Sequence, residues 1–163
     1  MGAVVLGYGN PSRGDDALGP RLLERADAWL AERPGLDVAT VADFQLQIEH
    51  ALDLKDRELV LFLDADAGCT GAFAFAPVGP ARDSSYSTHE LSPGAVLQVY
   101  RAVEGQAPPP AYVLSVRGER FDLGEPLSPA AEVHLEAAWA FLEDLLEDPR
   151  PAAWTAKLPC LHA

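Results

Sequence analysis

The chain has 163 residues, of which 48% are hydrophobic and 23% charged, a composition ordinary for a single globular domain with a buried core. Its 25 acidic residues outnumber 12 basic ones, for a net charge of −13, which argues against nucleic acid as a partner because a phosphate backbone binds a basic surface. No apolar run approaches the ~20 residues that cross a bilayer, so we expect no membrane partner either.

In chain order, the hydrophobic pattern predicts strands that alternate with helices. Strands are predicted over 3–9, 36–42, 58–63, 72–78 and 111–116. Helices are predicted over 16–32, 91–104 and 129–146, with a short helix or turn over 45–54. The pairs Ser92-Pro93 and Ser128-Pro129 have the residue types of an N-cap and a first helical position.

This order of elements predicts a three-layer α/β/α sandwich around a mostly parallel sheet of about five strands. We expect a single domain over residues 1–148. Residues 149–163 contain three prolines and show no clear period, so we expect a loosely held C-terminal extension there.

The turn after the first predicted strand carries two carboxylates. Residues 7–10 read Gly-Tyr-Gly-Asn, and Asp15 and Asp16 follow where a helix begins. A strand, a glycine turn and a helix opening form a common ligand site in α/β domains. Phosphate-binding turns leave the helix amides bare or add lysine, because their ligand is an anion. Two carboxylates attract a cation instead, so the sequence predicts a metal site at this turn.

Side chains able to bind a metal also follow other predicted elements. Asp64 and Asp66 come directly after the apolar run of the third predicted strand, and His89 lies in the polar loop before the 91–104 helix. The carboxyl ends of parallel strands meet at one edge of a sheet. Two carboxylates and one imidazole suit a borderline ion such as Zn²⁺ or Ni²⁺, and they leave a coordination position open for water or substrate.

Each of these residues also has an ordinary structural interpretation. Asp15 or Asp16 suits a helix N-terminus, Asp64 suits a turn or cap, and His89 suits an exposed surface. The remaining histidines are interpreted as structural or surface residues: His50, His134 and His162. The signals are weak one by one, and their expected meeting at one sheet edge is what favours a metal site.

Three segments together resemble the hydrogenase maturation endopeptidases, which trim the C-terminus of the large subunit of [NiFe] hydrogenases. They are residues 7–10 with Asp-Asp-Ala-x-Gly at 15–19, Leu-Phe-Leu-Asp-Ala at 61–65, and Ser-Thr-His-x-Leu at 87–91. The segments follow the family's order at about its spacing, and residues 125–129 resemble its closing segment. The resemblance covers residues 3 to about 147, and the combination is far more specific than any one motif.

The resemblance implies a cytoplasmic, metal-dependent endopeptidase whose partner is a nickel-loaded [NiFe] hydrogenase large-subunit precursor. The family's metal-binding and catalytic positions fall on Asp16, Asp64 and His89, and the divalent metal is expected to be the nickel of the substrate. Some members have Glu at the position of Asp16, so with the shorter side chain either the metal is expected closer to the helix or the loop is expected to move inward. Many relatives have a glycine-rich turn in place of residues 43–50, which read Asp-Phe-Gln-Leu-Gln-Ile-Glu-His. We expect this segment to select a hydrogenase class, such as the cytoplasmic NAD-linked type.

Two other classes of function stay open. A non-catalytic chaperone or scaffold that checks the precursor for nickel needs the same metal-binding residues. A Rossmann-like nucleotide-binding domain fits the strand, glycine turn and helix, but Ser12 stands where the third glycine is expected. The sequence has neither a Gly-x-Ser-x-Gly elbow nor a His-Glu-x-x-His helix, and Cys69 and Cys160 lack metal-knuckle spacing.

Overall fold

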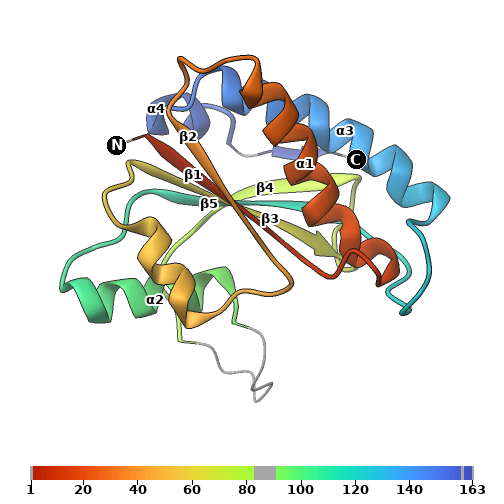
Figure 1. The fold of residues 1–163 in the computed structure, drawn as a ribbon, viewed down its shortest axis with the longest axis horizontal. Coiled ribbons are helices and arrows are strands. Elements are labelled where there is room, and N and C mark those ends of the chain that lie inside the picture. Colours follow the sequence, from red (N-terminus) through yellow and green to blue (C-terminus); the bar gives the residue numbers. More distant parts are fainter. Residues whose placement is uncertain (1, 83–90, 159, 163) are drawn as a thin grey trace.

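The computed structural model describes residues 2–82, 91–158 and 160–162. One sheet of six strands runs through the molecule in the order β2-β1-β3-β5-β4-β6 (Figure 1). The strands are β1 (Ala3–Tyr8), β2 (Val38–Asp43), β3 (Leu59–Asp66), β4 (Phe73–Val78), β5 (Ala111–Arg117) and β6 (Cys160–His162). Strands β2, β1, β3 and β5 are parallel, and β4 pairs antiparallel with both β5 and β6. The prediction of a mostly parallel sheet is confirmed.

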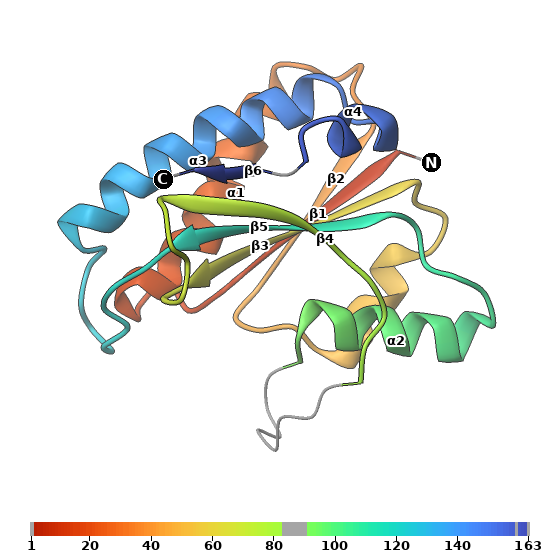
Figure 2. The ribbon, with the colours of Figure 1, turned by 180° about the vertical axis from the view of Figure 1, so that it is seen from behind.

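Helices cover both faces of this sheet. The α-helices are α1 (Leu18–Ala31), α2 (Pro93–Glu104), α3 (Pro129–Glu147) and α4 (Pro151–Thr155), and the 3-10 helices are η1 (Gly14–Ala17) and η2 (Ile48–Leu54). Figures 1 and 2 show α1, α3 and α4 on one side of the sheet and α2 on the other. The three-layer α/β/α architecture predicted from the sequence is therefore confirmed.

The central strand β3 shows why the sheet holds two hydrophobic cores. Leu59, Leu61 and Leu63 pack into the core under α1 and α3, whereas Val60 and Phe62 pack into the core with α2 and η2. All five side chains are fully buried. A continuous apolar run is typical of a parallel strand covered on both faces, and the alternation fixes which face each later residue of β3 occupies.

Two helices begin at the serine-proline pairs. The Oγ atoms of Ser92 and Ser128 accept hydrogen bonds from the backbone N–H groups of Ala95 and Ala131, at 3.1 and 3.2 Å. Each cap satisfies a backbone donor that has no partner inside the helix. The predicted starts of α2 and α3 are confirmed to within two residues.

The part of the C-terminal extension that the structure describes is packed against the domain, so the expectation of a loose tail is wrong for these residues. Trp154 in α4 is fully buried, and its Nε1–H points to the carbonyl oxygens of Leu145 and Asp148, at 2.9 and 3.1 Å. Strand β6 then pairs with β4 as the sixth strand of the sheet. This packing could not be predicted from hydrophobic periodicity, because α4 is anchored by the single indole of Trp154 and not by a repeated apolar stripe.

Among the described residues, no helix is both long and apolar enough to cross a membrane.

Candidate functional site

The carboxyl ends of β1, β2 and β3 lie together at one edge of the sheet. Their parallel pairing matches Tyr8 with Asp43 across β1 and β2, and Gly7 with Leu63 across β1 and β3. Beyond the end of β1, the Gly9 N–H donates to the Asp43 carbonyl at 3.1 Å, which ties the glycine turn to β2. This edge is where open α/β sheets bind ligands.

Asp16 is held at this edge by the glycine turn. Its Oδ2 accepts a hydrogen bond from the Asn10 N–H at 2.7 Å, and the residue is partly exposed. Gly9 has φ of +144°, and a Cβ at this position would collide with the Asp16 carbonyl oxygen. Only glycine fits such a close approach with that backbone conformation. The glycine turn therefore fixes the backbone of Asp16 and orients its carboxylate.

Asp64 lies near the end of β3 and is partly exposed. The alternation along the strand puts it on the α2 face, together with Val60 and Phe62. One turn after Asp16, Gly19 lies so close to the carbonyl oxygens of Tyr8 and Leu63 that a Cβ would clash with the first and press on the second. Asp16 and Asp64 therefore flank one close contact between the start of α1 and the ends of β1 and β3.

Asp66 serves a local role in the turn after β3. Strand β3 continues through Asp66, three residues beyond the end of the strand predicted over 58–63. The Asp66 Oδ1 accepts a hydrogen bond from the Gly68 N–H at 2.8 Å, a common way for aspartate to stabilise a turn. Asp66 therefore stabilises the turn that follows β3.

Asp15 is a buried structural residue. It is 0% exposed, and its carboxylate accepts hydrogen bonds from the N–H groups of Glu119, Arg120 and Ser128 and from the Ser128 hydroxyl, at 2.7 to 3.1 Å. Burial raises the pKa of this carboxyl, but the hydrogen bonds from Ser128, Glu119 and Arg120 together outweigh burial and leave the pKa below its ordinary value. Of the two adjacent carboxylates, Asp16 is the one available to a ligand.

His89 lies outside the described residues. Leu91, two positions later, donates its N–H to the Leu46 carbonyl at 3.5 Å, so the chain leading into α2 lies against the segment that follows β2. Within the described ranges, no group of three or more His, Cys, Asp or Glu side chains is arranged to hold a metal. The structure places Asp16 and Asp64 at the predicted edge, and the three-residue metal site stays a prediction.

A contact between Asp43 and His50, which was not predicted from the sequence, lies at the same edge of the sheet. His50 is 6% exposed, its Nδ1 accepts the Gln47 N–H at 2.8 Å, and its Nε2 lies 3.2 Å from the Asp43 Oδ2. Because Nδ1 acts as the acceptor, the ring proton of the neutral imidazole lies on Nε2 and is donated to Asp43. His50 is structural, as the sequence indicated, and it orients a third carboxylate at the sheet edge. Gln47 and His50 are three positions apart, which is the spacing of the two partners in a capping box. This spacing is the sequence signal that indicates the turn.

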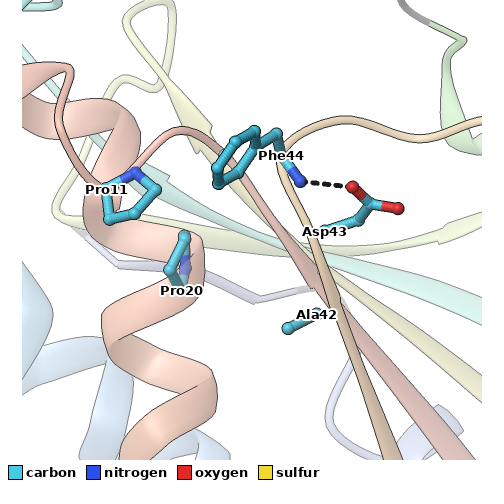
Figure 3. Close-up of a pocket in the computed structure, with 6 residues that line it drawn as sticks. Pro11, Pro20, Ala42, Asp43 and Phe44 are labelled. Carbon is cyan, nitrogen blue, oxygen red and sulfur yellow. Dashed lines mark hydrogen bonds between the residues drawn. The ribbon is translucent and has the colours of Figure 1, made fainter.

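A small apolar pocket opens beside the glycine turn, on the α1 side of the sheet (Figure 3). We name it the Phe44 pocket; it is lined by Gly9, Pro11, Pro20, Ala42, Asp43 and Phe44 and has a volume of about 310 Å³. Figure 3 shows the Phe44 ring and the two proline rings around the opening, with the Asp43 carboxylate turned away. The Phe44 N–H donates to the Asp43 Oδ1 at 2.7 Å, which fixes the backbone at the mouth of the pocket.

Comparison with known proteins gives matches at the level of structure. No family model matches the sequence, and no curated protein matches it. The solved hydrogenase maturating endopeptidase HybD of E. coli is 22% identical, with a TM-score of 0.67 over 90% of this chain and 93% of that chain. The solved [NiFe] hydrogenase maturation protease HycI of Thermococcus kodakarensis is 24% identical, with a TM-score of 0.69 over 90% of this chain and 92% of that chain. The resemblance stated from the sequence is confirmed at this level: the chain has the fold of the solved hydrogenase maturation endopeptidases.

Proposed function

We propose that this protein is an endopeptidase that removes a C-terminal peptide from a nickel-loaded [NiFe] hydrogenase large-subunit precursor. The observation that carries the proposal is the glycine turn, which presents the Asp16 carboxylate beside the end of the strand that bears Asp64. The likeness in fold to solved maturation endopeptidases over nearly the whole chain supports it. We expect the reaction to take place in the cytoplasm.

In this proposal Asp16, Asp64 and His89 bind the nickel that the precursor carries. Two carboxylates and an imidazole suit a borderline divalent ion and leave positions for the ligands that the precursor supplies. The nickel is thus part of the substrate, and its presence tells the enzyme that the precursor is loaded. A precursor without nickel offers these side chains no cation to bind, so it would be held weakly.

The proposed chemistry is hydrolysis of one peptide bond near the bound nickel. Water adds to the scissile carbonyl carbon while a carboxylate of the site accepts its proton, and the C–N bond then breaks as the leaving amine takes up a proton. A nearby cation stabilises the negative charge that develops on the carbonyl oxygen. Asp16 is suited to the role of proton acceptor because it is partly exposed and, among the described residues, accepts a hydrogen bond from the Asn10 N–H alone.

The surroundings of Cys69 argue against a cysteine-protease mechanism. Cys69 is 8% exposed, and its Sγ lies 3.9 Å from the Ser115 carbonyl oxygen. Burial raises the pKa of the Cys69 thiol, whereas a catalytic cysteine needs a lowered pKa to supply the thiolate. The proposed hydrolysis therefore relies on carboxylates and water.

The glycine turn also argues against a nucleotide. In a dinucleotide-binding turn the backbone N–H groups point at the pyrophosphate. Here the Asn10 N–H is occupied by the Asp16 carboxylate, which places a negative charge where a phosphate would bind. A nickel-checking chaperone would use the same carboxylates without cleavage, so only a cleavage assay separates it from the endopeptidase.

The test is mass spectrometry of a [NiFe] hydrogenase large-subunit precursor incubated with this protein, with and without nickel loading. We expect loss of one C-terminal peptide from the loaded precursor alone, and no loss with Asp16→Asn or His89→Ala. Glu24→Gln is the matched control because Glu24 is an exposed carboxylate on α1, the helix that directly follows Asp16. Nickel-dependent binding without cleavage would identify a chaperone instead, and absence of binding would refute both.

A further inference from the structure

We propose that the Phe44 pocket binds an apolar side chain of the precursor, close to the bond that is cleaved. This inference rests on the proposed function and adds a sequence requirement to it. The ligand is one side chain of a peptide in extended conformation, and the pocket selects it by size and polarity. Nickel would report that the precursor is loaded, and the pocket would fix the register of the peptide at the site.

The walls of the pocket favour an apolar side chain. Pro11, Pro20, Ala42 and the Phe44 ring supply its side-chain surface, and Gly9 adds backbone. Asp43 is the one charged residue among the described residues of the lining, and it turns its carboxylate to His50 on the opposite face of β2. Side chains of β2 alternate in agreement with this: Thr40 reaches Asp27 of α1, while Ala39 and Val41 pack on the α2 side. Of the described lining residues, none directs a charged group into the pocket.

The pocket is already shaped before a ligand arrives. Two of its walls are proline rings, which have a fixed φ and little side-chain freedom to lose. The backbone below the Phe44 ring is held by the hydrogen bond from its N–H to Asp43. A preformed site loses little conformational entropy on binding, so a modest apolar contact suffices for selection.

The position of the pocket links it to the proposed site. Gly9 lines the pocket, and the space where its Cβ would lie is taken by the Asp16 carbonyl. Asn10, the next residue, donates its N–H to the Asp16 carboxylate. Pro11, which follows, lines the pocket as Gly9 does. The three residues 9–11 thus form a wall with the pocket on one side and the Asp16 carboxylate on the other. A peptide bound at Asp16 has only this turn to cross before a side chain enters the pocket.

The sheet topology explains the direction in which the peptide leaves the site. Strands β1 and β3 are internal, whereas β2 is the terminal strand of the sheet on this side. A terminal strand has unpaired backbone groups along its outer edge, to which an extended peptide can pair. The pocket lies at the carboxyl end of β2, so a peptide that pairs with this edge passes its mouth. With about 310 Å³, the pocket is at the small end of ligand sites, as expected for one side chain.

The test compares kcat/KM for the nickel-loaded precursor and for precursors in which each residue flanking the cleaved bond is replaced singly by Ser. We expect one flanking position at which Ser lowers kcat/KM roughly 10-fold or more. Phe44→Ala should lower the rate on the native precursor and abolish this discrimination. Ala42→Leu, which fills the pocket from β2, should do the same through a different residue.

Leu52→Ala is the matched control. Leu52 is 67% exposed and Phe44 66% exposed, and only Phe44 lines the pocket, so the control should keep both the rate and the discrimination. Equal discrimination in wild type and Phe44→Ala would overturn the inference while leaving the endopeptidase intact. Failure of the wild type to cleave any loaded precursor would refute the proposed function itself. A change of mass by light scattering in Phe44→Ala alone would assign the pocket to a second copy of the chain and also overturn it.

Discussion

Asp15 and Asp16 are adjacent in the sequence, and the fold gives them opposite surroundings. The Asp15 carboxylate is fully buried and accepts four hydrogen bonds, three of them from backbone N–H groups. Asp16 is partly exposed, and within the described part of the chain its carboxylate accepts one hydrogen bond, from Asn10 in the same turn. Two carboxylates at a helix opening therefore do not have one shared role, because the number and origin of their partners decide what each can do.

The partners of Asp15 come from the far end of the chain. Glu119, Arg120 and Ser128 lie 104 to 113 positions later, and Ser128 is also the N-cap of α3. Three further backbone hydrogen bonds join the same regions. The N–H groups of Gly14 and Asp15 donate to the carbonyls of Glu125 and Arg120, and the Gly124 N–H donates to the Ser12 carbonyl. Asp15 thus connects the glycine turn to the loop before α3, and this connection holds Asp16 in place.

The largest loss of stability is expected from a carboxylate that is buried without hydrogen-bond donors, unlike that of Asp15. Leu61 in β3 is 0% exposed and lies within the core under α1. Leu61→Asp puts a charge there without a hydrogen-bond donor, which costs several kcal/mol against a total stability of about 5–15 kcal/mol. We expect the variant to be unfolded by circular dichroism. A cooperative melt near that of the wild type would show that burial alone does not penalise a carboxylate in this sheet.

The second-largest loss of stability is expected when the Asp15 carboxylate is removed and its hydrogen-bond donors lose their acceptor. Asp15→Ala leaves the N–H groups of Glu119, Arg120 and Ser128 without acceptors in a buried place. Hydrogen bonds to a charged group contribute about 1.5–3 kcal/mol each, and their losses are not additive. We expect the free energy of unfolding in urea to fall by roughly 3 kcal/mol, and a loss below about 1 kcal/mol would remove Asp15 as the connection between the two loops.

The third effect is the pH dependence that Asp15 imposes. Its pKa is lower in the folded chain than its ordinary value, so the folded chain favours the carboxylate. The stability it contributes is fully present above the unfolded pKa of about 3.9 and is lost as the pH falls through the folded value.

Asp15→Asn removes the titration of Asp15 and leaves the other carboxyl groups in place. The difference in stability between the wild type and this variant therefore isolates the contribution of Asp15. We expect the wild type to be more stable than this variant at about pH 6 and the difference to narrow toward about pH 3. Urea unfolding at each pH measures it. A difference that is constant over this range would mean that Asp15 titrates alike in the folded and unfolded chains.

The sequence predicted the sheet edge far better than the roles of single residues on it. Apolar runs such as 59–63 and serine-proline pairs act locally, so β1 to β5 and the starts of α2 and α3 were predicted within a few residues, whereas β6 was not predicted. The choice between Asp15 and Asp16 depends on donors more than 100 positions away, which no local pattern contains. Trp154 was missed for the same reason, since its indole bonds to the end of α3 and its helix has five residues.

The smallest effect on stability is expected at Asp16, together with the largest effect on processing. Asparagine keeps an oxygen that can accept the Asn10 N–H, so Asp16→Asn should change the free energy of unfolding by no more than about 0.5 kcal/mol. The same change removes the negative charge proposed to bind nickel, and loss of the charged ligand weakens both affinity and geometry. We expect no release of the C-terminal peptide from the loaded precursor, measured by mass spectrometry beside Glu24→Gln. Normal processing by a folded Asp16→Asn would show that Asp16 is not the carboxylate that binds the cation. Asp64 and Asp43, which are also partly exposed acids at this edge, would then be tested in its place.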